Sequence, residues 1–168
     1  MYNYITFGTS VLTKELWVQP KNNWGRKPAG GIWACKYTPK EEYLSAWQEW
    51  CDAEYPERGG LGSAVKFNLK DGARVCIIDE LADLDRLILL YADNTAPALS
   101  PVLDFEGMSL DYDVIELTAN GQRNTRETYP NSLLGWDMEC ILILNFDVII
   151  EQSSMDMVET RVVKSDKF

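Results

Sequence analysis

The feature that most constrains the fold is an uneven alternation of short apolar runs with amphipathic helix patterns. Residues 79–90 form a clear helix pattern after Asp79, and residues 103–110 a shorter one. About six runs have the length and composition of β-strands: Tyr2–Phe7, Ile32–Tyr37, Ala64–Leu69, Ala73–Ile78, Tyr112–Leu117 and Glu139–Phe146. Strands and helices that do not alternate regularly predict an α+β fold with mixed or antiparallel sheets and two to three covering helices.

Turn and cap residues define the expected connections. Asp71-Gly72 stands between two alternating apolar runs and predicts a β-hairpin of residues 64–69 and 73–78. Thr38-Pro39, with Glu41 behind them, predicts the start of a helix that carries Tyr43, Trp47 and Trp50 on one face. Residues 13–20 are expected to be a short helix or an extended piece, and residues 119–135 a polar loop. Residues 151–168 are expected to form an edge strand or a tail of the single domain 1–168.

The charge of the chain limits its partners. The 168 residues carry a formal net charge of −10, and Lys and Arg are scattered without a run of three. Nucleic-acid binding requires a basic surface, so we expect no direct nucleic-acid partner. A small-molecule site or a basic protein partner fits an acidic protein better. The chain lacks a signal-peptide pattern and an apolar run long enough to span a membrane, which predicts a cytoplasmic protein without membrane contact.

The residues available for catalysis are restricted by the absence of histidine. The absence of both histidine and a C-x-x-C pair excludes the common zinc sites, and the absence of histidine also excludes the histidine-dependent nucleophilic triads, so we expect no metal. The four cysteines, at positions 35, 51, 76 and 140, form no C-x-x-C pair and are interpreted as buried, reduced thiols. Acid–base chemistry near neutral pH must therefore come from carboxylates, tyrosines, lysines or cysteines.

A glycine pair followed by a tryptophan marks a candidate cleft. Gly30-Gly31 allows a sharp turn or a close approach to a ligand, and Trp33 follows on the next predicted strand. Trp33 either lines a pocket, where it can stack on a flat ring, or belongs to the core. Trp47 and Trp50 have the spacing of a buried helix face and are interpreted as core residues. Lys27 lies next to the glycine pair and can pair with a phosphate.

Two carboxylates are candidate functional groups. Glu139 and its neighbour Asp137 lie in front of the apolar strand Ile141–Leu144, close to Trp136, where a carboxylate can be desolvated. Glu106 lies at the start of a predicted helix, where the helix dipole favours a negative charge. The alternative for both is a solvated surface residue. Glu139 is the preferred catalytic candidate and Glu106 the second. Two arginines in the loop before Gly135 can clamp a phosphate or remain solvated.

The order of these motifs resembles the ADP-ribosyltransferase-like superfamily, in its His-Tyr-Glu branch. Phe7-Gly8-Thr9 is similar to its first motif, Gly31-Ile32-Trp33-Ala34 to its second, Ser45–Cys51 to its tryptophan-containing helix and Met138-Glu139-Cys140-Ile141 to its last motif. A second pattern, Lys-Pro-x-Gly-Gly-Ile-Trp at residues 27–33 with a later Leu-x-Gly-Trp-Asp at residues 133–137, is similar to uncharacterised bacterial and phage-type proteins. The resemblance covers most of residues 4–150 and implies an ADP-ribosyltransferase-like fold with NAD as the substrate.

The resemblance also implies roles for individual residues. Trp33 takes the place of the tyrosine that stacks on nicotinamide, and Glu139 that of the carboxylate that stabilises the oxocarbenium-like transition state. Phe7 stands where the family has its histidine, so the hydrogen bond to the ribose is expected from Tyr4, Thr6 or Thr9. Gly31 is expected at the nucleotide, and Lys27 or its neighbour Arg26 at the diphosphate.

Two functions from different classes follow from the sequence. The first is an NAD-using ADP-ribosyltransferase or NAD-cleaving protein, which requires Trp33 and Glu139 to converge on one cleft. The second is a non-enzymatic acidic interaction module, such as a phage-type inhibitor of a host defence system, which blocks a basic partner.

Overall fold

One mixed β-sheet forms the centre of the molecule. The computed structural model describes residues 1–23, 27–39, 43–54, 62–93 and 102–157. Within them, seven strands are arranged in the order β4-β5-β6-β2-β1-β3-β7, and only β4 and β5 are parallel neighbours. The strands are β1 (Tyr4–Phe7), β2 (Ile32–Lys36), β3 (Ser63–Leu69), β4 (Val75–Ile78), β5 (Val114–Leu117), β6 (Cys140–Ile143) and β7 (Ile149–Asp156). The predicted α+β class is confirmed.

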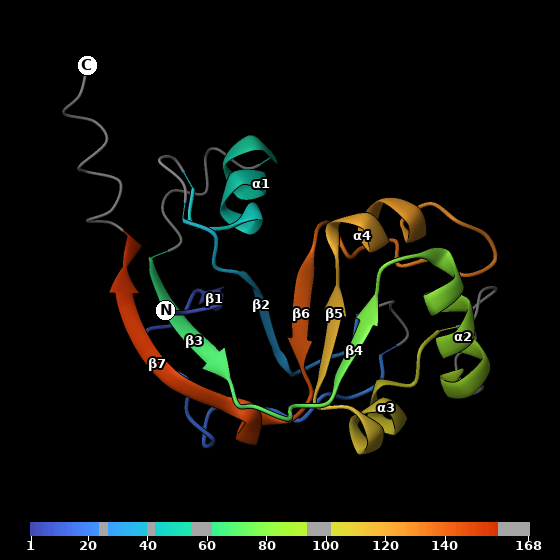
Figure 1. Cartoon of the computed structure of the whole chain (residues 1–168), viewed down its shortest axis with the longest axis horizontal. Coiled ribbons are helices and arrows are strands. Elements are labelled where there is room, and N and C mark those ends of the chain that lie inside the picture. The colour runs from blue at the N-terminus through green and yellow to red at the C-terminus, as the bar shows by residue number, and fades with distance from the viewer. Residues whose placement is uncertain (24–26, 40–42, 55–61, 94–101, 158–168) are drawn as a thin grey trace.

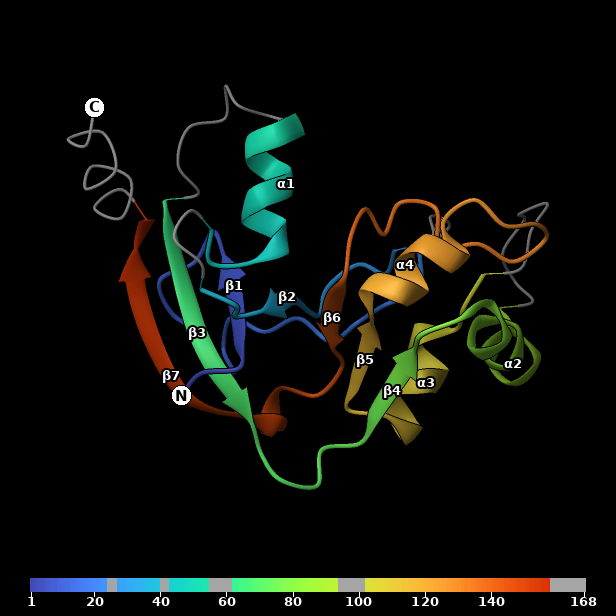
Figure 2. The same cartoon turned by 45° about the horizontal axis from the view of Figure 1, so that its top comes forward.

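The helices lie in two places along this sheet. They are α1 (Ala46–Glu54), α2 (Leu81–Tyr91), α3 (Phe105–Asp111) and α4 (Ala119–Thr125). Helix α1 stands alone near β1 and β2, whereas α2, α3 and α4 gather around β4 and β5 (Figures 1 and 2). The region between α1 and the other helices is where the candidate site lies.

Alternating side chains along the strands supply two large hydrophobic cores and a smaller third cluster around Ile5 and Ala64. On β5, Ile115 and Leu117 pack with α2 and α3 in one core, while Val114 belongs to the other. The second core lies where the curved sheet brings β3 against β2, β5 and β6, with Phe67 fully buried in it. Trp33 and Cys140 lie on the side of the first core. The face of the sheet that carries the helices therefore also carries the candidate site.

The predicted hairpin of residues 64–69 and 73–78 is wrong. Asp71 and Gly72 do form a turn, and Gly72 has the positive φ of 81° that such turns need. Both edges of β3, however, are occupied by β1 and β7. The chain therefore crosses to the far edge of the sheet, where β4 pairs in parallel with β5.

Two helix predictions also need correction. Helix α1 begins at Ala46, after the predicted start at Thr38, and Tyr43 lies outside it; residues 40–42 are outside the described residues. Its start is stabilised by Ser45, whose hydroxyl accepts a hydrogen bond from the Gln48 backbone, while the Gln48 side chain accepts one from the Leu44 backbone.

Residues 119–125, expected in a loop, form α4, in which the Thr118 side chain accepts from the Gly121 backbone as an N-cap. Residues 13–20 contain a turn at residues 14–16 and no helix.

Candidate functional site

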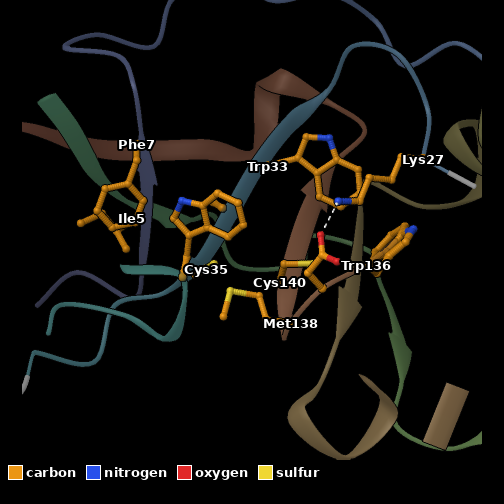
Figure 3. A pocket seen from close by; sticks show the side chains of 11 residues that line it. Ile5, Phe7, Lys27, Trp33, Cys35, Trp136, Met138 and Cys140 are labelled. Carbon is orange, nitrogen blue, oxygen red and sulfur yellow. Dashed lines mark hydrogen bonds and ion pairs between the residues drawn. The ribbon is translucent and has the colours of Figure 1, made fainter. Parts of the chain in front are cut away.

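A cavity of about 180 Å³ opens beside Trp33 between α1 and the segment that leads into β6. Figure 3 shows Trp33, Lys27 and Trp136 at one side of this cavity and Ile5 and Phe7 at the other. Aromatic, sulfur-containing and charged side chains from four parts of the chain meet there. The lining residues are Ile5, Phe7, Lys27, Trp33, Ala34, Cys35, Trp47, Trp136, Asp137, Met138 and Cys140. We call this space the aromatic cavity.

Three indole rings form much of its wall. Trp33 and Trp136 meet edge to face with 4.7 Å between ring centroids. Trp136 is 1% exposed and stacks on Phe105 of α3, so its position is fixed by the core. Trp47 comes from α1 and stacks on Trp50 at 5.1 Å. Trp47 and Trp50 are partly exposed, so their interpretation as core residues is wrong: Trp47 lines the cavity instead.

Lys27 and Asp137 place one positive and one negative charge at the cavity wall. The Lys27 ammonium lies 3.4 Å from the Asp137 carboxylate, and their side chains are 44% and 29% exposed. The same ammonium lies 5.6 Å from the centroid of the Trp33 ring. The Asp137 backbone carbonyl accepts hydrogen bonds from Gln122 and Arg126 of the α4 region. These bonds fix the backbone that carries the carboxylate.

Two thiols add neutral, polarisable surface to the cavity. The pairing of Ala34 with Ile141 places Cys35 and Cys140 opposite each other on β2 and β6. Burial raises the pKa of Cys35 to about 12 and raises the pKa of Cys140 as well. The Cys35 thiol donates to the Glu139 backbone carbonyl at 3.6 Å. Both thiols are therefore protonated at neutral pH and are poor nucleophiles. All four cysteines are free thiols; Cys35 and Cys76 are buried as predicted, whereas Cys51 and Cys140 are partly exposed.

Some predicted site residues lie in or beside the aromatic cavity. Trp33 and Lys27 line it directly. Thr6, Thr9 and Gly31 line a neighbouring cavity of about 370 Å³, which shares Trp33 as a wall. In that second cavity the Thr6 hydroxyl donates to the Trp33 carbonyl at 2.8 Å, so it is already engaged. The Thr9 hydroxyl likewise donates to the Val11 carbonyl.

The predicted site residues Glu139, Tyr4 and Glu106 line neither of these two cavities. Glu139 lines a separate shallow depression with Lys36 and Glu116, and it does not line the aromatic cavity. Tyr4 lies near that same pair, where burial, followed by the charge of Glu116, raises its pKa. Glu106 pairs with Lys21 at 3.1 Å at the start of α3. The expected convergence of Trp33 and Glu139 on one cleft is therefore not found. Arg26 lies outside the described residues.

Trp136 and Asp137 are site residues that the sequence reasoning did not select. Their signal is the dipeptide itself: a tryptophan and a carboxylate directly before an apolar strand, with Gly135 adopting a positive φ of 101° in front of them. Because β6 pairs with β2, residues just before β6 come close to the residues around Trp33. The position of β6 in the sheet was needed to recognise this.

Comparisons with protein-family models, curated proteins and solved structures find no match to this chain. Among the described residues, no three cysteine, aspartate or glutamate side chains are grouped so that they could hold a metal ion. The described part of the chain also contains no helix with the length and apolar character needed to cross a membrane. The resemblance to ADP-ribosyltransferases therefore remains a prediction.

Proposed function

We propose that the aromatic cavity binds the nicotinamide ring of NAD, and that the protein is an NAD-cleaving or ADP-ribosyl-transferring enzyme. The observation that supports this proposal is the meeting of three indoles and one carboxylate in a single cavity. Indole faces and edges favour a flat heteroaromatic ring. A carboxylate beside such a ring can stabilise positive charge on an attached ribose.

The size of the cavity fits this assignment. A volume of about 180 Å³ is below the roughly 300–1,000 Å³ of sites that enclose a whole drug-sized ligand. The cavity therefore takes one ring, while the ribose and the diphosphate lie outside its mouth. Lys27, which is half exposed, supplies a positive charge at that mouth. The neighbouring cavity, which shares Trp33 and Phe7, offers further space for the nucleotide.

We assign the charge-stabilising role to Asp137 instead of Glu139, because Asp137 is the only carboxylate among the described residues that line the cavity. In the proposed reaction the bond between the nicotinamide nitrogen and the ribose C1′ breaks, and nicotinamide leaves with the electron pair. Asp137 stabilises the resulting oxocarbenium-like ribose. Water or a nucleophile on a target protein then bonds to C1′ and loses one proton, which gives ADP-ribose or an ADP-ribosylated target.

The experiment is calorimetric titration of the protein with NAD, with nicotinamide release measured in the same sample by chromatography. We expect binding that weakens about tenfold or more in Trp33→Ala, because a stacked ring contributes roughly 1–3 kcal/mol. Asp137→Asn should lose nicotinamide release, while the matched variant Glu139→Gln should keep it. The reverse result would return the catalytic role to Glu139, and absence of NAD binding in the folded wild-type protein would refute the proposal.

The position of Glu139 away from the cavity favours a second candidate, a non-enzymatic protein that binds a nucleotide without cleaving it. NAD binding without nicotinamide release would support that candidate. An acidic interaction module that blocks a basic partner, such as an inhibitor of a host defence system, is the remaining proposal. It is tested by pull-down with the chain as bait if NAD does not bind.

A further inference from the structure

We propose that the Lys27 ammonium occupies a cation-binding position of the aromatic cavity, between Asp137 and Trp33. When a ligand binds, Lys27 leaves these two partners and pairs with another group. A cationic ring would replace the Lys27 ammonium beside Asp137 and Trp33. The released ammonium would then pair with an anionic group of the same ligand outside the cavity. This inference rests on the proposed function for the type of ring, and it adds that the ligand carries both a cation and an anion.

The contacts of Lys27 fit a cation position. An aromatic wall combined with a carboxylate is the arrangement by which proteins recognise planar or quaternary cations. In the structure the Lys27 ammonium makes both contacts itself, one to the Asp137 carboxylate and one to the Trp33 ring. The cavity therefore already selects a positive charge, and Lys27 supplies it.

The geometry also makes Lys27 easy to displace. Its 3.4 Å distance to Asp137 is longer than the roughly 2.7–2.9 Å of a strong charge-assisted hydrogen bond. Its 5.6 Å distance to the Trp33 centroid is close to the limit of about 6 Å for a cation–π contact. The side chain is 44% exposed, so water already hydrates part of it. Both contacts are therefore weak, and an exchange of partners costs little.

Trp33 and Asp137, in contrast, are held in place. Trp33 lies within β2, and its backbone carbonyl accepts a hydrogen bond from Thr6. The Asp137 carbonyl is held by Gln122 and Arg126. Since the partners are fixed and the lysine is long and half exposed, the lysine is the part of the site that moves.

The charge of the ligand then determines what happens to Lys27. A neutral ring gains no charge–charge attraction from Asp137 and leaves the ion pair in place. A cationic ring without an anionic group must displace Lys27 into water, so the two compete. A cationic ring with a diphosphate offers Lys27 a new partner. The ion pair between Lys27 and the diphosphate then offsets the free energy lost when Lys27 leaves Asp137 and Trp33.

Three probes and two variants separate these cases. The probes are nicotinamide, which is neutral, 1-methylnicotinamide, which is cationic, and NAD, which combines the cationic ring with a diphosphate. The variant is Lys27→Met, which keeps a long apolar stem and removes the charge. The control is Lys21→Met, because Lys21 is an exposed lysine that pairs with Glu106 and does not line the aromatic cavity. Circular dichroism establishes that both variants fold.

We expect Lys27→Met to bind 1-methylnicotinamide roughly three- to tenfold more tightly than the wild type, because the competing ammonium is gone. The same variant should bind NAD several-fold more weakly and nicotinamide almost unchanged, while Lys21→Met should match the wild type with every probe. If the wild type binds NAD but 1-methylnicotinamide binds equally well to the wild type and to Lys27→Met, this inference alone is overturned. Absence of binding by all three probes would overturn the proposed function as well.

Discussion

Asp113 offers a test of how the half of the sheet that carries β4, β5 and β6 is held together. This residue is 6% exposed at the start of β5. Its carboxylate accepts hydrogen bonds from the Arg74 backbone at 2.9 Å, the Arg74 guanidinium at 3.0 and 3.2 Å and the Asn145 amide at 2.9 Å. These hydrogen bonds, those from the Arg74 side chain above all, hold the pKa of Asp113 well below its usual range. The carboxylate links the segments before β4 and after β6.

We expect Asp113→Asn to lower the free energy of unfolding by about 3 kcal/mol. The amide has nearly the same shape, but it removes the charge and turns a donor toward groups that donate. Breaking a buried ion pair costs roughly 3–5 kcal/mol. We take the lower end because the Arg74 side chain is 51% exposed, so water compensates part of the loss.

Urea denaturation at pH 7 measures this loss, and Asp147→Asn is the matched control. Asp147 also forms an ion pair, with Lys14, but the two side chains are 58% and 63% exposed, so we expect a change within about 1 kcal/mol. Because the pKa of Asp113 is lowered by folding, its contribution is present above the unfolded value near 3.9 and is lost as the pH falls toward the folded value. The difference between wild type and Asp113→Asn should therefore shrink below about pH 4.

An equal effect of the two substitutions at pH 7 would refute this reasoning. So would a difference between wild type and Asp113→Asn that stays constant down to pH 2. Either result would mean that the hydrogen bonds to Asp113 do not favour its charged form.

Three further predictions concern the helices and the thiols. Gly121→Ala should destabilise the protein by about 1–3 kcal/mol in thermal unfolding, because a Cβ atom there would lie 2.1 Å from the backbone carbonyl oxygen of Ile78 in β4. The control Asn124→Ala, on the exposed side of α4, should change the stability by less than about 0.5 kcal/mol. Ser45→Ala should cost about 1 kcal/mol by removing the cap of α1, and an unchanged unfolding midpoint would contradict the role assigned to this hydroxyl. Cys35 and Cys140 should react with a disulfide reagent at pH 8 far more slowly than free cysteine does, because burial raises the pKa of both thiols, and they should react quickly only in denaturant. Rapid modification of these two thiols in the native protein would show that they are exposed.

The local elements were predictable where the apolar pattern was strong. Helix α2 has an apolar stripe in which Leu84 and Leu87 are fully buried, as predicted, but its N-cap is Glu80, which forms a capping box with Asp83, and not Asp79 as expected. Helix α4 was missed because its sequence is polar, contains Asn120-Gly121 and lacks an apolar stripe. Thr118 and packing against α2 stabilise it instead.

Long-range pairing was the part that the sequence could not supply. The pattern around Asp71-Gly72 describes a turn correctly, but nothing local says that β1 and β7 occupy the edges of β3. The same limit applies to the site. Trp33 was identified from its own neighbours in sequence, whereas Asp137 becomes a site residue only because β6 lies beside β2.

The central position of β6 has a consequence for the nascent chain. Strand β6 lies between β2 and β5, so it joins a half built around early strands to a half built around later ones. Until residues 140–143 have been synthesised, β2 and β5 each present an edge without its partner, and such edges can pair with other chains. The segment that precedes β6 also carries Trp136 and Asp137. The joining of β2 to β5 through β6 and the assembly of the aromatic cavity are therefore one event, late in synthesis, and a chain that stops before β6 would lack both.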